Sequence, residues 1–513
     1  MLGGRWASIL VPCWAFCVAA AACSAAGSTS GRAGPALDSG TVAEAAPSPT
    51  GPAAEAGENG DDGGSEVGDA TPPPPFDAAA GLTPAVTCED AVGDVYVTPP
   101  SLPPMTMASR GDIVRCALDG VLTTSEITSD FAAKSVAGLV PTTPTTLYRI
   151  AYRTYREDGV AGVSTARVYL PHLPRSLPLP VVAVAHPTEG LAPSCTTSQV
   201  ATSLEDEALP WAALGFAVIA TDYAGLGNGG VQGYLGNHDQ AHSMLDSARA
   251  LRALLPAGIL DDRVLLVGYS QGGGAVLASQ GLERSYGSGG KIDAVVVFAA
   301  EWVSRLDSLQ LVHTLESPDN LTISTGITVP VVTAMRDYAF GYNVLGPDAA
   351  TVTFPSGNAA GIASALMSLC EVQFGGYIQG VAVHVGDIFD DGFRSSLLAC
   401  IEDAGGDAGC SGTGQRFYDW LTSDLVAPDP SGAPVLYVQG LSDTIMPPSQ
   451  EGACNIGLLQ EAGVPVQVCT DPAASHTDVV GRNVPFAISW ANSKLYGGST
   501  PTCSSAGMPA CQP

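Results

Sequence analysis

The stretch that decides the fold is RVLLVGYSQGGGAVLA, residues 263–278. A mostly apolar, strand-like run precedes Ser270, and a helix-forming AVLA follows a group of glycines. A strand that turns sharply into a helix presents a serine hydroxyl at the apex of the turn. Such a turn requires small residues two positions before and two positions after the serine, and Gly268 and Gly272 meet this requirement. The stretch therefore predicts a nucleophilic serine on a strained turn.

The segments around this turn alternate between strand-like and helix-like patterns from about residue 145 onward. The residues 245–255 place leucine and alanine at helical spacing. Short apolar runs typical of strands buried on both faces occur at 179–187, 215–223, 261–270, 291–300 and 433–443. This alternation predicts an α/β fold with a mostly parallel sheet and helices on both faces.

Residues 301–433 interrupt this alternation with several amphipathic helical patterns. One of them places Phe389, Phe393 and Leu397 on one side. A long helical insertion late in a parallel-sheet domain is typical of a cap, so we expect a helical cap here. The alternative is that this apolar stripe only packs into the main core.

The candidate acid and base follow from the chain order that the α/β-hydrolase fold uses, which is Ser, then Asp or Glu, then His. Asp443 ends the strand-like run 433–443, and His476 is the only histidine that follows it. The order predicts that His476 activates Ser270 and that Asp443 orients His476. The alternatives are a simple turn-forming role for Asp443 and a surface loop role for His476.

The oxyanion that forms during acyl transfer needs backbone N–H donors. The N–H of Gln271, at the start of the helix, is the first candidate. The second donor should come from the loop VVAVAHPTEG at 181–190. Pro187 has no N–H, so we expect Thr188 to supply it.

A metal site is the rival interpretation of another motif. His238 and His242 stand four residues apart in NHDQAHSM, close to the H-E-x-x-H pattern of zinc proteases. Aspartate replaces the required glutamate, no third ligand suggests itself, and no C-x-x-C pair occurs. We therefore expect no metal site.

Charge and hydropathy exclude several classes of partner. The net charge of −29 argues against binding nucleic acid and against electrostatic attraction to anionic lipid. No segment after the N-terminus is apolar for the roughly 20 residues that a membrane span needs. We expect no transmembrane helix in the mature chain.

The N-terminus is typical of an export signal over residues 1–23, with the apolar run ILVPCWAFCVAAAAC after Arg5. The run ending at Cys23 is similar to a lipoprotein signal, which predicts a lipid anchor on Cys23; ordinary cleavage and a single anchoring helix are the alternatives. Residues 24–85 are rich in Ala, Gly, Pro and acidic residues, which predicts a disordered tether. A catalytic domain over residues 86–513 would follow, in a secreted or extracytoplasmic protein.

Ten of the 13 cysteines lie after the signal. An even number in an exported chain predicts disulfides. Only the short-range pairs Cys400–Cys410 and Cys503–Cys511 have local support.

The blocks TDYAGLG, GYSQGGGA, GLSDTIMP and SHTD occur in the order seen in a known family. From about residue 93 to about residue 496 the chain resembles the secretory lipases typified by fungal lipase A, especially their bacterial members. AHPTEGLAPSC is similar to the oxyanion loop of that family, and DVYVTPPSLP to the start of its catalytic domain. Pro187 departs from the glycine that bacterial members usually have.

The resemblance implies an α/β-hydrolase fold with a helical cap, and hydrolysis of an ester or lipid substrate without a cofactor. It implies that Ser270 is the nucleophile, Asp443 the acid and His476 the base, and that Gln271 supports the oxyanion. It also implies a disulfide Cys195–Cys370. The alternatives are a peptidase or acyltransferase with the same three residues, and a surface-binding protein that keeps the fold without activity.

Overall fold

The computed structural model describes residues 81–512 except 201–204, 305–315, 317–318, 320–328, 348–349 and 403–408. The expected signal 1–23, Cys23 and residues 24–80 of the expected tether lie outside the described residues. The last residues of that expected tether are packed against the domain. Leu82 is buried, and the N–H of Ala85 donates to the carbonyl oxygen of Leu254 at 2.7 Å. The apolar side chain of Leu82 explains why packing begins before residue 86.

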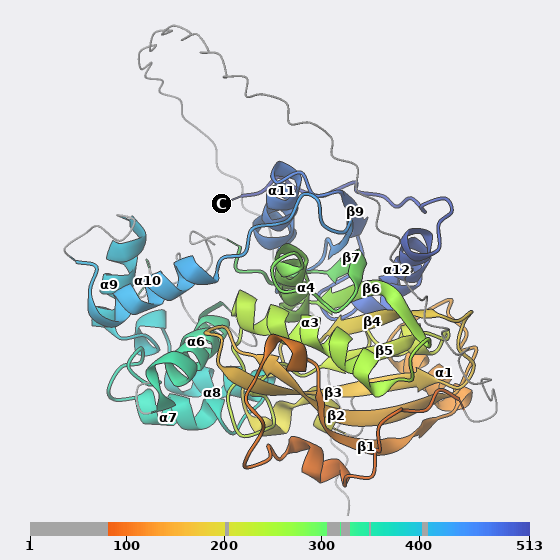
Figure 1. Ribbon diagram of the computed structural model, residues 1–513. Coiled ribbons are helices and arrows are strands. Elements are labelled where there is room, and N and C mark those ends of the chain that lie inside the picture. Colours follow the sequence, from red (N-terminus) through yellow and green to blue (C-terminus); the bar gives the residue numbers. More distant parts are fainter. Residues whose placement is uncertain are drawn as a thin grey trace, which may run out of the picture. The chain divides into compact units, whose positions relative to one another are not determined.

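A nine-stranded sheet forms the centre of this part of the chain, in the order β1-β2-β3-β5-β4-β6-β7-β8-β9 (Figure 1). The strands are β1 (Ile113–Leu122), β2 (Thr145–Tyr155), β3 (Ala161–Pro171), β4 (Leu179–Ala185), β5 (Ala217–Thr221), β6 (Leu260–Tyr269), β7 (Lys291–Phe298), β8 (Val435–Gly440) and β9 (Val466–Asp471). Neighbouring strands pair in parallel along the series β5, β4, β6, β7, β8 and β9. The pairs β1–β2, β2–β3 and β3–β5 are antiparallel. The predicted α/β-hydrolase fold with a mostly parallel sheet is confirmed.

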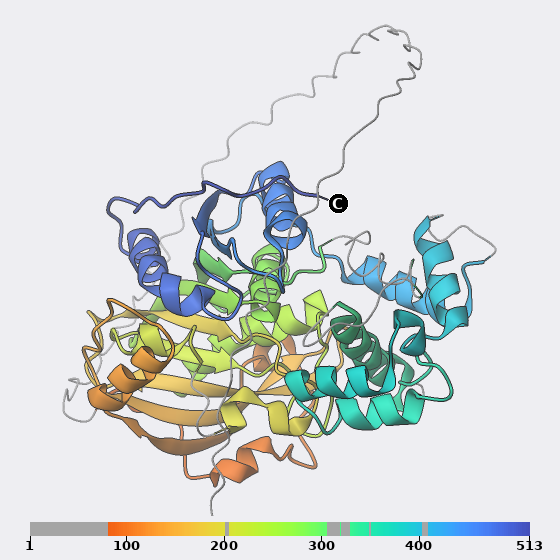
Figure 2. The same cartoon turned by 180° about the vertical axis from the view of Figure 1, so that it is seen from behind.

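Helices cover both faces of the sheet because successive residues of the central strands point to opposite faces (Figure 2). Val181 and Ala183 of β4 face one core, and Val182 and Val184 face the other. The first core is closed by α3 (Asn237–Leu254), α4 (Gln271–Leu282) and α11 (Ala453–Glu461). The second is closed by α1 (Thr124–Ala133), α2 (Leu209–Ala212) and α12 (Val479–Leu495).

The helical cap lies between β7 and β8 in the chain. Its described helices are α6 (Val329–Phe340), the π-helical turn η5 (Gly341–Leu345), α7 (Ala359–Leu366), α8 (Glu371–Val381), α9 (Asp391–Glu402) and α10 (Gly412–Asp424). Phe389, Phe393 and Leu397 are buried in an apolar cluster that the cap shares with the loops after β4 and β5. The stripe read from the sequence therefore forms a core for the cap and does not join either face of the main sheet.

The cap is fastened to the main domain where α10 meets the first turn of α3. The Asp424 carboxylate accepts hydrogen bonds from the backbone N–H groups of Asn237, at 2.6 Å, and His238, at 2.9 Å. These groups have no partner inside the helix, and the positive end of the helix dipole favours a carboxylate there. Asp424 therefore caps α3 from another part of the chain.

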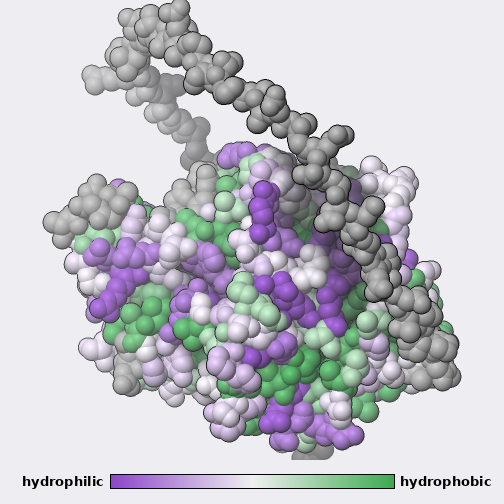
Figure 3. Space-filling model, viewed as in Figure 1, coloured by the Kyte–Doolittle hydropathy of each residue, from purple (hydrophilic) through white to green (hydrophobic). Residues whose placement is uncertain are grey.

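The face of the molecule drawn in Figure 3 carries no single large apolar surface. In the view of Figure 3, apolar residues form small patches separated by polar ones. No helix among the described residues is both long and apolar enough to cross a membrane.

Candidate active site

Ser270 lies at the apex of the turn between β6 and α4. Its backbone has φ 54° and ψ −120°, a conformation that non-glycine residues rarely adopt. Two hydrogen bonds hold this conformation: the N–H of Ser270 donates to Phe298 at 3.0 Å, and the carbonyl oxygen of Ser270 accepts from Glu301 at 2.9 Å. Both partners lie at or just after the end of β7, so the neighbouring strand fixes the turn.

The glycines around Ser270 are required by close contacts. A Cβ atom on Gly268 would lie 2.1 Å from the carbonyl oxygen of Gly272. A Cβ atom on Gly272 would lie 2.0 Å from the carbonyl oxygen of Ala185, at the end of β4. These distances agree with the sequence argument that residues two before and two after the serine must be small.

Ser270, His476 and Asp443 are brought together at the carboxyl ends of the parallel strands. His476 Nε2 lies 3.0 Å from Ser270 Oγ, and His476 Nδ1 lies 2.8 Å from Asp443 Oδ2. All three residues are buried. The other carboxylate oxygen of Asp443 accepts from the N–H groups of Ile445 at 2.9 Å and Met446 at 2.8 Å.

This geometry assigns one tautomer to His476. With the Nδ1 proton donated to the Asp443 carboxylate, Nε2 carries a lone pair and can accept the proton of the Ser270 hydroxyl. The position of the ring is fixed further by its own backbone, since the Tyr269 hydroxyl donates to the carbonyl oxygen of His476 at 2.8 Å. The arrangement can therefore remove the proton of Ser270 as its oxygen attacks an acyl carbon.

The two residues expected to stabilise an oxyanion lie on the segments that flank Ser270. Gln271 is the first residue of α4, and Thr188 lies in the loop after β4. His186 Nδ1 lies 2.5 Å from the carbonyl oxygen of Pro187, so the His186 ring is hydrogen-bonded to the residue just before Thr188. Both Gln271 and Thr188 are buried.

Their side chains have partners that the sequence analysis did not identify. The Thr188 hydroxyl lies 2.9 Å from the Tyr234 hydroxyl, and the Gln271 side-chain amide donates to Gln232 Oε1 at 2.9 Å. Gln232 and Tyr234 come from the loop between β5 and α3. The only sequence signal near them is TDYAGLG, which ends before them at Gly227.

Half-buried carboxyl groups lie close to the loop after β4. Burial and, to a smaller extent, the nearby Glu451 carboxyl together raise the pKa of Glu301 to about 8. Burial also raises the pKa of Glu371 to about 9, with contributions from Glu189 and Glu301. At neutral pH Glu301 and Glu371 therefore carry protons and can donate as well as accept hydrogen bonds.

The cap is joined covalently to the loop after β4. The disulfide Cys195–Cys370 connects the segment after Thr188 to the start of α8. Beside it, the N–H of Glu371 donates to the carbonyl oxygen of Glu189 at 2.9 Å. The pairing that the resemblance implies is present, and the start of α8 is fixed next to Thr188.

The ten cysteines of the described residues form five disulfides. Cys400–Cys410 is confirmed. The expected pair Cys503–Cys511 is wrong. Cys503 pairs with Cys469 on β9 and Cys511 pairs with Cys454, because the C-terminal segment runs along the main domain and does not fold back on itself. Cys88–Cys116 completes the set.

His238 and His242 have other partners in the structure. His238 Nδ1 lies 3.0 Å from Asp424 Oδ1, and the His242 ring stacks on Tyr286 with centroids 4.0 Å apart. Within the described ranges, no group of three or more His, Cys, Asp or Glu side chains could hold a metal ion.

The comparison with known proteins bears on this geometry. The model of the secretory lipase family matches residues 194–298, which include Ser270. The resemblance to the secretory lipases is confirmed. The family match supports a hydrolase of the lipase kind, and the solved structures below share the fold.

Three solved structures share the fold. The rice cell wall degrading esterase LipA of Xanthomonas oryzae has 17% identity and a TM-score of 0.56, covering 75% of this chain and 98% of its own. Candida antarctica lipase A has 15% identity and a TM-score of 0.53, covering 81% and 90%. A putative hydrolase of Legionella pneumophila has 17% identity and a TM-score of 0.55, covering 75% and 100%. No curated protein matches the sequence.

Proposed function

We propose that the protein is an exported carboxylic ester hydrolase that uses Ser270, His476 and Asp443 as a catalytic triad. The observation that carries the proposal is the continuous hydrogen-bond chain from Ser270 Oγ through His476 to Asp443, at 3.0 and 2.8 Å. The strained backbone of Ser270 supports it, because such strain persists where function requires it.

The reaction passes through an acyl-enzyme. Ser270 Oγ attacks the ester carbonyl carbon while its proton moves to His476 Nε2. The carbonyl oxygen becomes an oxyanion, which the backbone N–H groups of Gln271 and Thr188 stabilise. His476 then gives the proton to the departing alkoxide, and the alcohol leaves. A water molecule repeats the sequence on the acyl-enzyme and releases the carboxylic acid.

Asp443 acts through His476. Its carboxylate holds the imidazole in the tautomer that accepts the serine proton, and it stabilises the imidazolium that forms. The two backbone N–H groups on its other oxygen keep the carboxylate in place. This explains why an acidic side chain is needed at the end of β8.

We also propose that residues 1–23 are the export signal, with a lipid anchor on Cys23, and that the segment that follows is a tether. Five disulfides in the described residues support an oxidising, extracytoplasmic location. Mass spectrometry of the mature N-terminus tests the anchor, and an unmodified N-terminus beyond Cys23 would contradict it.

The experiment that tests the function is hydrolysis of p-nitrophenyl esters beside p-nitroanilides, together with labelling by a fluorophosphonate. We expect ester cleavage and labelling in the wild type, and neither in Ser270→Ala. Ser279→Ala is a matched control, because Ser279 is buried in the same helix and its hydroxyl only bonds the Ala275 carbonyl oxygen at 2.7 Å. Preferred anilide cleavage would indicate a peptidase. An unlabelled wild type would indicate a binding protein.

A further inference from the structure

Residues 231–234, which we call the brace, lie in the loop between β5 and α3 and contact both sides of the proposed oxyanion site. Gln232 makes the first connection. Its Oε1 accepts from the Gln271 side chain at 2.9 Å, and its Nε2 donates to the carbonyl oxygen of Gly190 at 2.9 Å. Gln232 and Gln271 are fully buried. One amide group thus joins the start of α4 to the loop after β4.

Tyr234 makes the second connection. Its hydroxyl lies 2.9 Å from the Thr188 hydroxyl and 3.4 Å from Glu301 Oε2. Glu301 in turn donates its backbone N–H to the carbonyl oxygen of Ser270 at 2.9 Å. A chain of hydrogen bonds therefore runs from Thr188 through Tyr234 and Glu301 to the backbone of the nucleophile.

The brace is itself held from behind. Arg156 donates to the carbonyl oxygen of Val231 at 3.0 Å and forms a two-point ion pair with Asp239, with N–O distances of 2.6 and 2.8 Å. Asp239 also accepts from the N–H of Gly233 at 2.7 Å. Asn343, in the cap, donates to the same Val231 oxygen at 3.1 Å. The brace therefore has fixed anchors in both the main domain and the cap.

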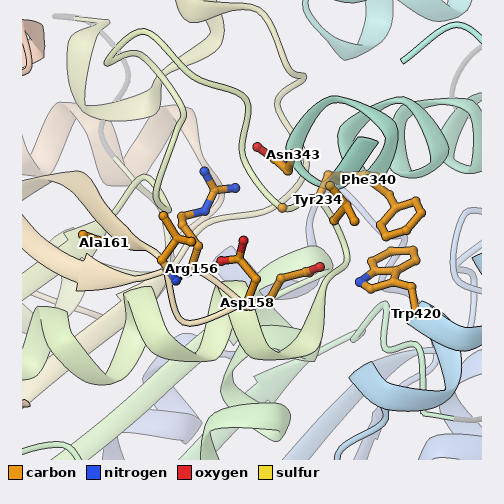
Figure 4. Close-up of a pocket in the computed structure, with 11 residues that line it drawn as sticks. Arg156, Asp158, Ala161, Tyr234, Phe340, Asn343 and Trp420 are labelled. Carbon is orange, nitrogen blue, oxygen red and sulfur yellow. Dashed lines mark hydrogen bonds between the residues drawn. The ribbon is translucent and has the colours of Figure 1, made fainter. Parts of the chain in front are cut away.

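Figure 4 shows the space behind the brace. It is a cavity of about 220 Å³ whose wall includes Arg156, Asn343, Phe340, Trp420 and Tyr234. Tyr234 thus lines this cavity, and its hydroxyl is hydrogen-bonded to Thr188. The Tyr234 hydroxyl and the Gln232 amide are therefore the two groups that connect the brace to the loop after β4.

We propose that the brace sets the separation of the two oxyanion donors, with Gln232 and Tyr234 as positioning residues. The inference rests on the proposed function. The donors come from two different loops, and a donor stabilises an oxyanion only when it is held within about 0.5 Å of its productive place. Neither Gln232 nor Tyr234 needs to touch substrate, because each acts through Thr188, Gly190 or Gln271.

The test compares Tyr234→Phe with Tyr152→Phe. Both remove one hydroxyl from a fully buried tyrosine, but the Tyr152 hydroxyl bonds Thr221 and Ser243 at 2.6 and 2.8 Å, away from the brace. We expect kcat for a p-nitrophenyl ester to fall about 10- to 30-fold in Tyr234→Phe, less than the roughly 100-fold or more for a lost direct donor. We expect KM to change less than twofold, and Tyr152→Phe to keep the wild-type kcat.

A second readout separates positioning from general destabilisation. A trifluoromethyl ketone forms an oxyanion on Ser270, so its affinity should weaken in Tyr234→Phe by the same factor as kcat. Gln232→Met should show the same pattern, because it keeps the side-chain length and removes both hydrogen bonds. Thr188→Val should match Tyr234→Phe, Thr188→Ser should retain more of kcat, and the Tyr234→Phe/Thr188→Val double variant should be scarcely worse than either.

If folded Tyr234→Phe keeps the wild-type kcat and the wild-type inhibitor affinity, the proposal that the brace positions the donors is wrong. If Tyr234→Phe does not fold, Thr188→Val removes the same hydrogen bond from the other side and decides the question. If KM rises by the same factor by which kcat falls, Tyr234 has a merely structural role. That result would also overturn the proposal that the brace positions the donors. A wild-type protein that cleaves no ester would overturn the proposed function, which is a separate result.

Discussion

The substitution Gly272→Ala tests how the turn around Ser270 depends on close backbone contact. The new Cβ atom would lie 2.0 Å from the carbonyl oxygen of Ala185, 2.5 Å from its carbonyl carbon and 2.8 Å from the carbonyl oxygen of His186. All three atoms belong to backbone at the end of β4, so no flexible side chain can move aside. Either α4 or the end of β4 must shift.

The size of the shift follows from these distances. Cβ contacts below 3.0 Å are essentially never found, so the gap must open by about 1 Å from 2.0 Å. Thr188 comes two residues after His186, so the shift separates it from Ser270 and Gln271. A misplacement of about 1 Å can cost about 100-fold in rate, and overpacking of this kind costs about 1–3 kcal/mol of stability. We expect kcat to fall about 100-fold in a protein that still folds.

Steady-state hydrolysis of p-nitrophenyl butyrate measures the rate, and urea denaturation measures the stability. Gly457→Ala is the matched control: Gly457 also lies in a helix, α11, but nothing lies within 4 Å of the added Cβ. This control should keep full activity and gain about 0.5–1 kcal/mol of stability. Gly272→Ala with kcat within threefold of wild type would refute the reasoning.

Three further predictions concern the triad, a disulfide and pH. Ser270→Ala and His476→Ala should each lower kcat by about 10⁶-fold, and the double variant should be scarcely worse; additive losses would contradict a shared mechanism. Replacing Cys195 and Cys370 by serine should lower the free energy of unfolding by about 2–4 kcal/mol in urea denaturation, and an unchanged midpoint would argue against it. Burial raises the pKa of Glu371 from 4.5 to about 9, so the folded protein keeps a proton that the unfolded chain loses. The stability that the Glu371 carboxyl group contributes should therefore be greatest below pH 4.5 and decline as pH rises toward 9. Calorimetry across this pH range should show a smaller loss of stability in Glu371→Gln than in the wild type. An equal loss in the two proteins would contradict the contribution assigned to the Glu371 carboxyl group.

The parts of the site that were predictable from the sequence are those fixed by local pattern and chain order. Ser270 is marked by its own neighbours, because the tight turn imposes glycines at fixed spacing. Asp443 and His476 are marked by their order after it and by the strands that precede them. The structure brings these three side chains within hydrogen-bonding distance, and their catalytic roles stay predictions.

The parts that were not predictable depend on contacts between distant segments. Tyr234 and Gln232 stand in a loop with no motif, and their partners Thr188 and Gln271 lie 46 and 39 residues away in the chain. The antiparallel strands β1 to β3 were also not predicted from the sequence. Whether a segment joins a sheet, and in which direction, depends on the distant strands with which it pairs. Cys503 was paired with Cys511 on proximity in sequence alone, whereas the path of the C-terminal segment joins it to Cys469.

The outermost strands of the sheet, β1 and β9, have a feature in common. The Cys88–Cys116 disulfide fastens the segment before β1 to that strand, where Glu89 bridges to Ala117. On β9, Cys469–Cys503 fastens the C-terminal segment, and the N–H of Thr470 donates to the carbonyl oxygen of Ser504 at 2.8 Å. An exposed edge strand is a template on which a second molecule can add a strand and begin aggregation. Both edges here are blocked by covalently attached chain, so reducing these two bonds would expose both edge strands to intermolecular β-pairing.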